Sequence, residues 1–426
     1  MPSAIKSGVG VIPRGSGAAE GCRAAFLRIR AMTDHLAEPL TAEDMLVQPM
    51  TDASPTKWHL AHTTWFFETF VLAPHKPGHR DFHPDFRFLF NSYYNAVGSR
   101  PDRDKRGSFS RPGLDEVRAY RRYVDEQVQE LLAAEPGSDS LAILELGLHH
   151  EQQHQELMVT DIKCVFGSNP LRPAYRELSA ERVAPAPPQR WLEFEGGIQA
   201  VGYDGTGFCF DNELERHDVL LQPFRLASRP VTNSEYLEFM EDGGYSRPEL
   251  WLSEGWDAVR AHGWEAPLYW ERKHDGWLVL TLAGMRAVEP SEPVCHVSLF
   301  EADAYARWVG ARLPTEFEWE ATAASEPVVG NFLESERFHP VPAAASRSLR
   351  QIFGDVWEWT ASPYVAYPGF RPAGGALGEY NGKFMSSQMV LRGGSCATPQ
   401  SHIRASYRNF FPPSTRWQFT GIRLAQ

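Results

Sequence analysis

The sequence has few cysteines and no long apolar run, and each absence removes a class of protein. Its 426 residues include five cysteines, an odd number, and none of them forms a Cys-x-x-Cys pair. Dispersed cysteines of this kind argue against a disulfide framework and against a zinc–thiolate site. No segment holds about 18 consecutive apolar residues, so no membrane span is expected. These features predict a cytoplasmic protein with reduced thiols.

Positive charge is also in short supply. The 42 lysines and arginines are outnumbered by 54 acidic residues, which leaves a net charge of −12. This balance argues against nucleic acid or an anionic membrane as the main partner. Residues 1–20 have neither a signal-peptide pattern nor a membrane anchor, and they predict a flexible arm. A chain of this length exceeds one ordinary core, so two domains are expected.

The part of the chain that follows the arm has a helical pattern. Four segments show helical spacing of their apolar residues, namely 20–36, 54–72, 113–135 and 139–166. In the second of these, Ser54 is the expected N-cap and Pro55 the expected first helical residue. Four long helices with one long connection, residues 74–112, predict a helical bundle over residues 21–167. A connection of this length is expected to carry function.

The rest of the chain has a different composition. Residues 168–190 hold five prolines and predict an interdomain linker. Residues 191–426 contain most of the 13 tryptophans and mix short β-forming segments with glycine and proline turns. One or two clear helices are expected, notably at 298–311. We therefore predict an α+β protein whose second domain, 191–426, is rich in loops.

The most informative segment is "LHHEQQHQEL", residues 148–157. On a helix that turns about 100° per residue, His150 and His154 share one face, with Gln153 at its edge. No carboxylate lies on that face, because Glu156 points almost the opposite way. Two imidazoles one turn apart on a bundle helix are a common way to hold a divalent metal.

A third ligand is available in "WHLAHTTW", which contains His59 and His62. Three neutral nitrogens would favour Fe(II), Zn(II) or copper over calcium or magnesium. Three other interpretations stay open at this point. The histidines could be hydrogen-bonded bundle residues, or "HEQQH" could be a zinc protease signature with Glu151 as general base. A site of two histidines and one carboxylate is the third, although Asp161 lies about 10 Å along the helix axis from His154.

Motifs from both halves of the chain together resemble one family. They are "SPTKWHLAHTTWFFE", "HHEQQHQEL", "RLPTEFEWEAT", "GDVWEWTAS", "LRGGSC", "RASYRNFFPP" and "GIRLA". Nearly the whole chain after the arm is similar to the sulfoxide synthases of ergothioneine biosynthesis, the EgtB type. This resemblance implies a DinB-like four-helix bundle followed by a domain with the formylglycine-generating-enzyme fold, which is C-type-lectin-like.

The resemblance also implies a reaction and a metal. Enzymes of this family use non-haem Fe(II) and O2 to join the imidazole C2 of hercynine to cysteine or γ-glutamylcysteine, and they oxidise the sulfur to a sulfoxide. Carried over by motif, the iron ligands are His62, His150 and His154. His59 and His149 become their neighbours. The open alternatives are a thiol-dependent metalloenzyme of the DinB family and a non-catalytic, metal-stabilised lectin-like binding module.

The long connection contains "FNSYYNAVGSRPDRDKRG", which resembles a second branch of the family. Tyr93 and Tyr94 are the expected catalytic phenols, because a phenol beside the iron can donate a proton or a hydrogen atom. The alternative is that two adjacent aromatic residues simply anchor the connection. Arg100, Arg103 and Arg106 are expected to bind the carboxylate of the thiol substrate.

Hercynine is expected to contact residues from both halves of the chain. Gln153 would bind its carboxylate, Asn409 its polar side, and Phe410 and Phe411 its trimethylammonium group and imidazole. Cys396 stands alone in "GGSC", whereas formylglycine-generating enzymes use two nearby cysteines for copper, so that activity is not expected. The motif tryptophans Trp319, Trp357 and Trp359 are then interpreted as core residues.

Overall fold

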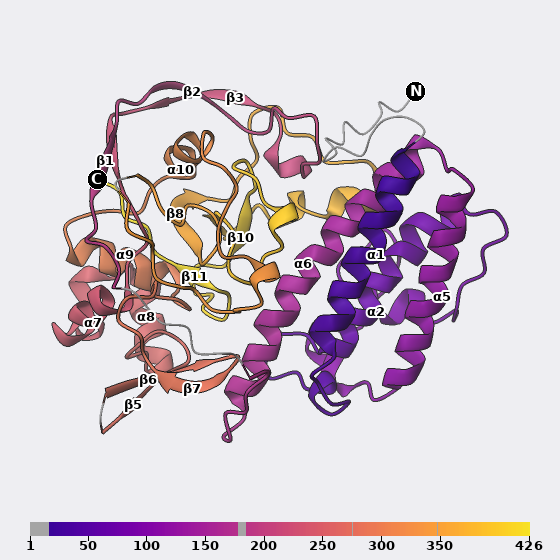
Figure 1. The fold of residues 1–426 in the computed structure, drawn as a ribbon, viewed down its shortest axis with the longest axis horizontal. Helices are drawn as coiled ribbons and strands as arrows, with labels where there is room; N and C mark the ends of the chain where they lie inside the picture. The colour runs from indigo at the N-terminus through magenta and orange to yellow at the C-terminus, as the bar shows by residue number, and fades with distance from the viewer. Residues whose placement is uncertain (1–16, 178–184, 275, 347) are drawn as a thin grey trace. The chain divides into compact units, whose positions relative to one another are not determined.

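The computed structural model describes residues 17–177, 185–274, 276–346 and 348–426 (Figure 1). Most of the predicted arm and residues 178–184 of the predicted linker lie outside this part. The described chain divides into two units. The first contains the residues up to Asn169 together with Asp204–Asp211 and Arg371–Gly382, and the second contains the remainder.

Four long helices form the bundle of the first unit and lie side by side in Figure 1. They are α1 (Ala18–Ala37), α2 (Thr56–Phe66), α5 (Leu114–Ala133) and α6 (Ser138–Ser168). The predicted Ser54 cap is wrong by one residue, since Pro55 is the N-cap of α2. The Ser54 amide instead donates to Asp161 Oδ2 of α6 at 2.8 Å, which fastens the start of α2 to α6.

Helix α2 continues beyond Phe66 in a wider spiral. A π-helical turn, Phe67–Leu72, leads into the short α3, Ala73–His75. Gly147 of α6 explains how this turn fits against the bundle, because a Cβ there would lie 2.6 Å from Cε1 of the Phe67 ring. Single π-turns of this kind often occur near functional sites.

The long connection between α3 and α5 has little regular structure but many anchors. It contains α4, Phe86–Leu89, and the 3-10 helix Arg103–Ser108. Its end is held by the buried Lys57 of α2, whose ammonium donates to the carbonyl oxygens of Phe109, Ser110 and Pro112 at 2.8–3.2 Å. The end of the connection is therefore fastened to α2.

The second unit is built around a four-stranded sheet with the order β10-β9-β8-β11. These strands are β8 (Trp357–Pro363), β9 (Met389–Arg392), β10 (Asn409–Phe411) and β11 (Thr420–Gly421). Neighbours pair antiparallel except β11, which runs parallel to β8 with Thr420 opposite Trp357. This central sheet is what brings the C-terminal motifs together.

Smaller elements surround that sheet. Two antiparallel pairs are formed by β1 (Trp191–Phe194) with β4 (Phe224–Ala227) and by β2 (Gly197–Val201) with β3 (His217–Leu221). A three-stranded sheet consists of β5 (Trp270–Lys273), β6 (Gly276–Thr281) and β7 (Gly284–Ala287). The helices are α7 (Asn233–Glu241), α8 (Ser253–His262), α9 (Leu299–Trp308) and α10 (Glu316–Ala323). Helix α9 confirms the predicted helix at 298–311, and Ser298 with Glu301 forms its capping box.

The core of the second unit contains the motif tryptophans. Trp319, Trp357 and Trp359 are at most 1% exposed, which confirms the interpretation of these residues as core. Buried ion pairs lie among them: Glu358 binds Arg423, and Trp319 Nε1 donates to the same carboxylate at 2.7 Å. The motif residues therefore determine the fold, since their polar atoms are paired with one another.

The domain boundaries predicted from composition treat residues 191–426 as one continuous domain, but two segments of this range belong to the other unit. Residues 204–211 and 371–382 belong to the bundle unit, although they lie far beyond the predicted linker in sequence. Conversely, Tyr175 and Arg176 of the predicted linker donate their amides to the Leu282 carbonyl of the second unit, at 2.8 and 3.1 Å. Of the helices in the described residues, none combines the length and apolar content needed to cross a membrane.

Candidate metal centre

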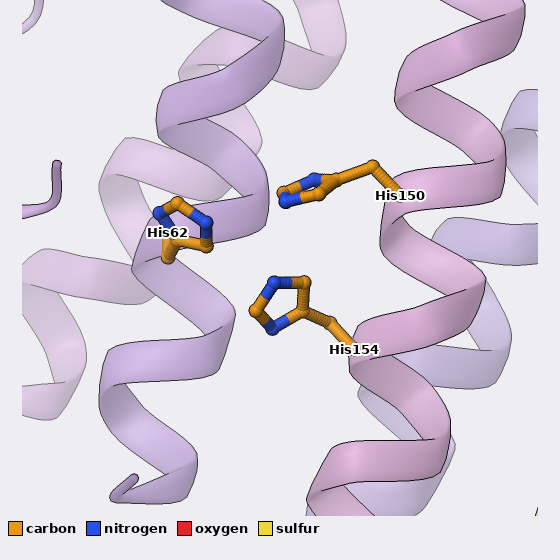
Figure 2. A group of neighbouring side chains, drawn as sticks. All are labelled: His62, His150 and His154. Carbon is orange, nitrogen blue, oxygen red and sulfur yellow. The ribbon is translucent and has the colours of Figure 1, made fainter. Parts of the chain in front are cut away.

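Helices α2 and α6 bring three histidines together inside the bundle. His62 comes from α2, and His150 and His154 lie one turn apart on α6. Figure 2 shows the three rings directed into the space between the two helices. One ring nitrogen from each lies within 4.8 Å of the other two. The structure thus groups the same three histidines that the motifs select as metal ligands.

Hydrogen bonds determine which nitrogens face the centre. His62 Nδ1 lies 2.6 Å from the Phe90 carbonyl oxygen, to which it donates, and its buried Nε2 has no hydrogen-bond partner. His154 Nδ1 lies 2.8 Å from His59 Nδ1, and His59 Nε2 lies 3.0 Å from Asp161 Oδ2. A carboxylate and a second histidine therefore orient His154 from behind, as is usual for metal-bound imidazoles.

The three imidazoles are in the state that a metal requires. Burial lowers the pKa of His62 and of His154 well below the usual range, and it lowers that of His150 to about 3. Neutral imidazole is the ligand form of histidine. Both buried ring nitrogens of His150 lack a hydrogen-bond partner. Unpaired buried nitrogens that converge on one point fit a divalent transition metal.

Glu151 cannot act as a general base at this centre. Its carboxylate binds Arg30 and Arg121 at 3.0 and 2.8 Å. Burial by itself would raise the pKa of Glu151, but the two arginines hold it down at about 2. The zinc protease interpretation is therefore wrong. Asp161 does not act as a third ligand either, because its Oδ2 is hydrogen-bonded to His59 and accepts from the Ser54 amide.

Aromatic side chains enclose the three histidines. Trp58 stacks on His62 with ring centroids 4.5 Å apart, and Phe66 stacks on His150 at the same distance. The Arg106 guanidinium lies over the Trp58 ring, 3.6 Å from its centroid, and donates a hydrogen bond to Ser54 Oγ at 2.9 Å. A wall of this kind excludes water and holds the imidazoles in fixed orientations.

The two predicted tyrosines lie next to each other in this wall. Their ring centroids are 4.6 Å apart and their hydroxyl oxygens 3.5 Å apart. Tyr94 is fully buried and contacts Phe66, which in turn stacks on His150. Burial raises the pKa of both tyrosines, so both phenols keep their protons at neutral pH.

A third tyrosine, which sequence reasoning missed, comes from residues 371–382. The Tyr380 ring lies 5.9 Å from His150 and 6.4 Å from Tyr93, and its hydroxyl donates to Gln153 Oε1. The sequence around it, "GEYNGKF", has no period or motif that separates it from an ordinary loop. Only its contacts in the folded chain reveal it, and they also show what holds Gln153.

The three predicted arginines occupy different environments. Arg106 is buried, whereas Arg100 is exposed and Arg103 pairs with Asp52 at 3.4 Å with about half of its side chain in solvent. Burial, followed by the charges of Arg103 and Arg100, lowers the pKa of Arg106 to about 9. A carboxylate beside Arg106 would relieve this cost, so Arg106 is the strongest candidate of the three.

The predicted hercynine residues of the second unit lie on one strand. Asn409, Phe410 and Phe411 are half-buried residues of β10. Asn409 Oδ1 accepts from the Phe410 amide at 2.9 Å, and the Phe410 ring stacks on Tyr364 at 4.0 Å. These contacts are all internal to the second unit, and the assignment of the three residues to hercynine stays a prediction.

Comparison with protein families confirms the predicted fold. Residues 179–426 match the family described as Sulfatase-modifying factor enzyme 1-like domain, and residues 25–158 match the DinB superfamily. The first match covers more than half of the chain. The two halves therefore have the fold classes that the motifs imply.

Three curated relatives are similar over almost their whole length, and all three are named hercynine oxygenase. The protein of Mycobacterium tuberculosis is 33% identical, over 87% of this chain and 91% of its own. That of Mycolicibacterium smegmatis is 34% identical over the same shares. That of Mycolicibacterium thermoresistibile is 32% identical, over 87% of each chain.

Proposed function

The chain belongs to the hercynine oxygenase family, and we propose from this membership and from its three-histidine centre that it is a sulfoxide synthase of ergothioneine biosynthesis. The observation that carries the proposal is the convergence of His62, His150 and His154 in a chain that matches these enzymes over most of its length. The substrates would be hercynine, O2, and cysteine or γ-glutamylcysteine.

The proposed reaction balances without any further oxidant. The thiol loses the hydrogen from its sulfur and the imidazole loses the hydrogen from C2 as the C–S bond forms. The sulfur takes one oxygen atom of O2, and the other oxygen atom leaves as water with the two hydrogens. The single O2 thus accepts four electrons. Fe(II) bound by the three histidines would supply the redox chemistry that activates O2.

The chain contributes position, charge and protons. The three histidines are neutral ligands, so Fe(II) held by them would keep its positive charge and would attract a thiolate more strongly than a carboxylate-bound ion would. Two hydrogen bonds hold the ligand rings in place: His62 Nδ1 donates to the Phe90 carbonyl oxygen, and His154 Nδ1 is hydrogen-bonded to His59 Nδ1. The phenol of Tyr94 is the proposed proton donor, because its ring packs on Phe66, which stacks on the ligand His150.

Substrate recognition is assigned to the side chains that the family motifs select. Arg106 would bind the carboxylate of the thiol substrate, and Gln153, already held by Tyr380, would bind the carboxylate of hercynine. Asn409 would bind the polar side of hercynine, with Phe410 and Phe411 against its cation. A fixed trimethylammonium group cannot donate a hydrogen bond, so aromatic faces are its natural partners.

The decisive experiment measures O2 consumption together with product. We expect uptake only when Fe(II), hercynine and a thiol are all present, with one sulfoxide formed per O2. Cysteine and γ-glutamylcysteine are assayed side by side to identify the sulfur donor. His62→Ala, His150→Ala and His154→Ala should abolish turnover and weaken iron binding sharply. His83→Ala, at a histidine whose side chain is 43% exposed, should change neither.

The same assay separates the alternatives. Uptake of O2 without hercynine would favour a different thiol-dependent metalloenzyme of the DinB family. Full metal binding with no turnover on either thiol would favour a metal-stabilised binding module. Iron binding that survives loss of His62 but is lost with His59 would show that the wrong histidine of α2 has been chosen.

A further inference from the structure

A second cluster of metal-binding side chains lies in the bundle unit, at the start of the long connection. Glu68 belongs to the π-helical turn Phe67–Leu72, and His79 and Asp81 follow it in the connection. One donor atom from each lies within 4.8 Å of the other two. None of the three residues takes part in the proposed reaction, so the cluster needs an explanation of its own.

The imidazole of His79 is the unusual member of this cluster. Its side chain is only 3% exposed, and neither buried ring nitrogen has a hydrogen-bond partner. Nε2 lies 3.6 Å from Glu68 Oε1 and 3.8 Å from Asp81 Oδ1, and both distances are too long for hydrogen bonds. A buried imidazole without hydrogen bonds is unfavourable unless something else occupies the space beside it.

The spacing suits an ion in that space. Zinc binds nitrogen and oxygen at about 2.0–2.2 Å, so two of its ligand atoms in a tetrahedron lie about 3.3–3.6 Å apart. The separations of 3.6 and 3.8 Å from His79 to the two carboxylates are close to this value. Side chains placed for a direct ion pair would be expected to approach more closely than this.

The carboxylate of Glu68 is held in place from behind. Tyr120 donates its hydroxyl to Oε2 at 2.6 Å, and the Phe82 amide donates to Oε1 at 2.9 Å. Hydrogen bonds of this kind orient metal ligands. Asp81, whose side chain is 48% exposed, opens the cluster to solvent. The ammonium of Lys76 does not occupy it, since that group binds Gln127 and Glu130.

We propose that Glu68, His79 and Asp81 form a second divalent cation site, with zinc as the cation that best suits one imidazole and two carboxylates. The ion would tie the start of the connection to the π-helical turn and so to α5, through Tyr120. It acts on structure and does not touch hercynine or the thiol. The proposal is therefore independent of the proposed function.

The test counts zinc ions bound to the full chain. Metal-free protein is dialysed against buffered Zn²⁺, and bound zinc is measured by mass spectrometry. We expect two zinc ions per wild-type chain, one after His79→Ala, one after His62→Ala, and none after both changes. His83→Ala is the matched control, because His83 is a neighbouring histidine outside the cluster, and it should keep two.

A second variant protects the test against a folding defect. Asp81→Asn changes an exposed carboxylate, so it leaves the core intact, and it should also lose the second zinc. The zinc bound by the three histidines serves in each variant as an internal check of the fold. The proposal is overturned if either His79→Ala or Asp81→Asn binds as many zinc ions as the wild-type protein.

Discussion

At the scale of single residues, the phenols near the three histidines come from two distant parts of the chain. Tyr93 and Tyr94 lie in the long connection, and Tyr380 lies in residues 371–382. Tyr94 is packed against Trp65 and Phe70, whereas the hydroxyl of Tyr380 holds the amide oxygen of Gln153. The two positions suggest different tasks, proton donation for Tyr94 and positioning of hercynine for Tyr380.

Removing the two hydroxyls separately should separate these tasks. Tyr94→Phe keeps the ring and its packing, so iron and substrates should still bind, but sulfoxide formation should slow about a hundredfold or more. Oxygen should then go more often to the thiol alone and give a sulfinic acid. Tyr380→Phe should mainly raise the KM for hercynine. Product ratios by mass spectrometry and the two KM values report both effects.

Tyr93→Phe is the natural control, since it alters the same aromatic pair. We expect a milder effect from it, because its ring would still stack on Tyr94 at 4.6 Å. If Tyr380→Phe yields the sulfinic acid and Tyr94→Phe does not, the proton donor has been assigned to the wrong segment. Unchanged yield and rate in all three variants would remove the phenols from the reaction.

At the scale of elements, α2 and α6 could be predicted well because their signals are local. The helical period placed His150 and His154 on one face, and it also placed Glu151 off that face. Here Glu151 binds Arg30 and Arg121. The choice of His62 over His59 could not be derived from period alone, since both are on α2. It came from the family resemblance, and the grouping of three histidines agrees with it.

The π-helical turn and residues 371–382 escaped prediction for a physical reason. The turn depends on Phe67 packing over Gly147, and Tyr380 depends on Gln153, 227 positions away. Neither contact leaves a periodic trace in the sequence. The same is true of Glu379, whose carboxylate accepts from the amides of Asn95 and Ala96. Long-range contacts of this kind complete the site after local structure has formed.

Helix α6 also carries a buried carboxyl group where it packs against α1. Glu145 is 4% exposed, and its Oε2 has no hydrogen-bond partner. Burial raises the pKa of Glu145 from 4.5 to about 8, so the folded chain keeps a proton that the unfolded chain loses. Stability from this group is complete below about pH 4.5 and is lost as the pH rises through 8.

Replacing this carboxyl should flatten the pH dependence of stability. Between pH 5.5 and pH 7.5 the wild-type free energy of unfolding should fall by up to about 2.7 kcal/mol through Glu145, at about 1.4 kcal/mol per pH unit. Glu145→Gln stays neutral and should lack this component. Urea unfolding at the two pH values measures the difference. Parallel pH dependence in both proteins would show that Glu145 is ionised when folded.

At the scale of the whole molecule, the second half of the chain supplies parts of the bundle unit. Residues 204–211 place Phe208 against His149, with stacked rings 3.8 Å apart, and Phe210 against Tyr380 at 5.4 Å. Asn381 binds Asp211 at 2.7 Å, which joins the two inserted segments to each other. The bundle therefore holds the metal ligands by itself but depends on later residues for the rest of its wall.

This dependence predicts how a fragment of residues 17–169 should behave. It keeps all three histidine ligands and the His59–Asp161 support, so its Fe(II) affinity should stay within about tenfold of the full chain. It lacks Tyr380, whose hydroxyl holds Gln153, and the whole of β10. Hercynine binding, measured by calorimetry on the iron-loaded fragment, should therefore be lost. Circular dichroism checks that the helices persist, and hercynine binding at full-length affinity by the folded fragment would show that the bundle alone recognises the substrate.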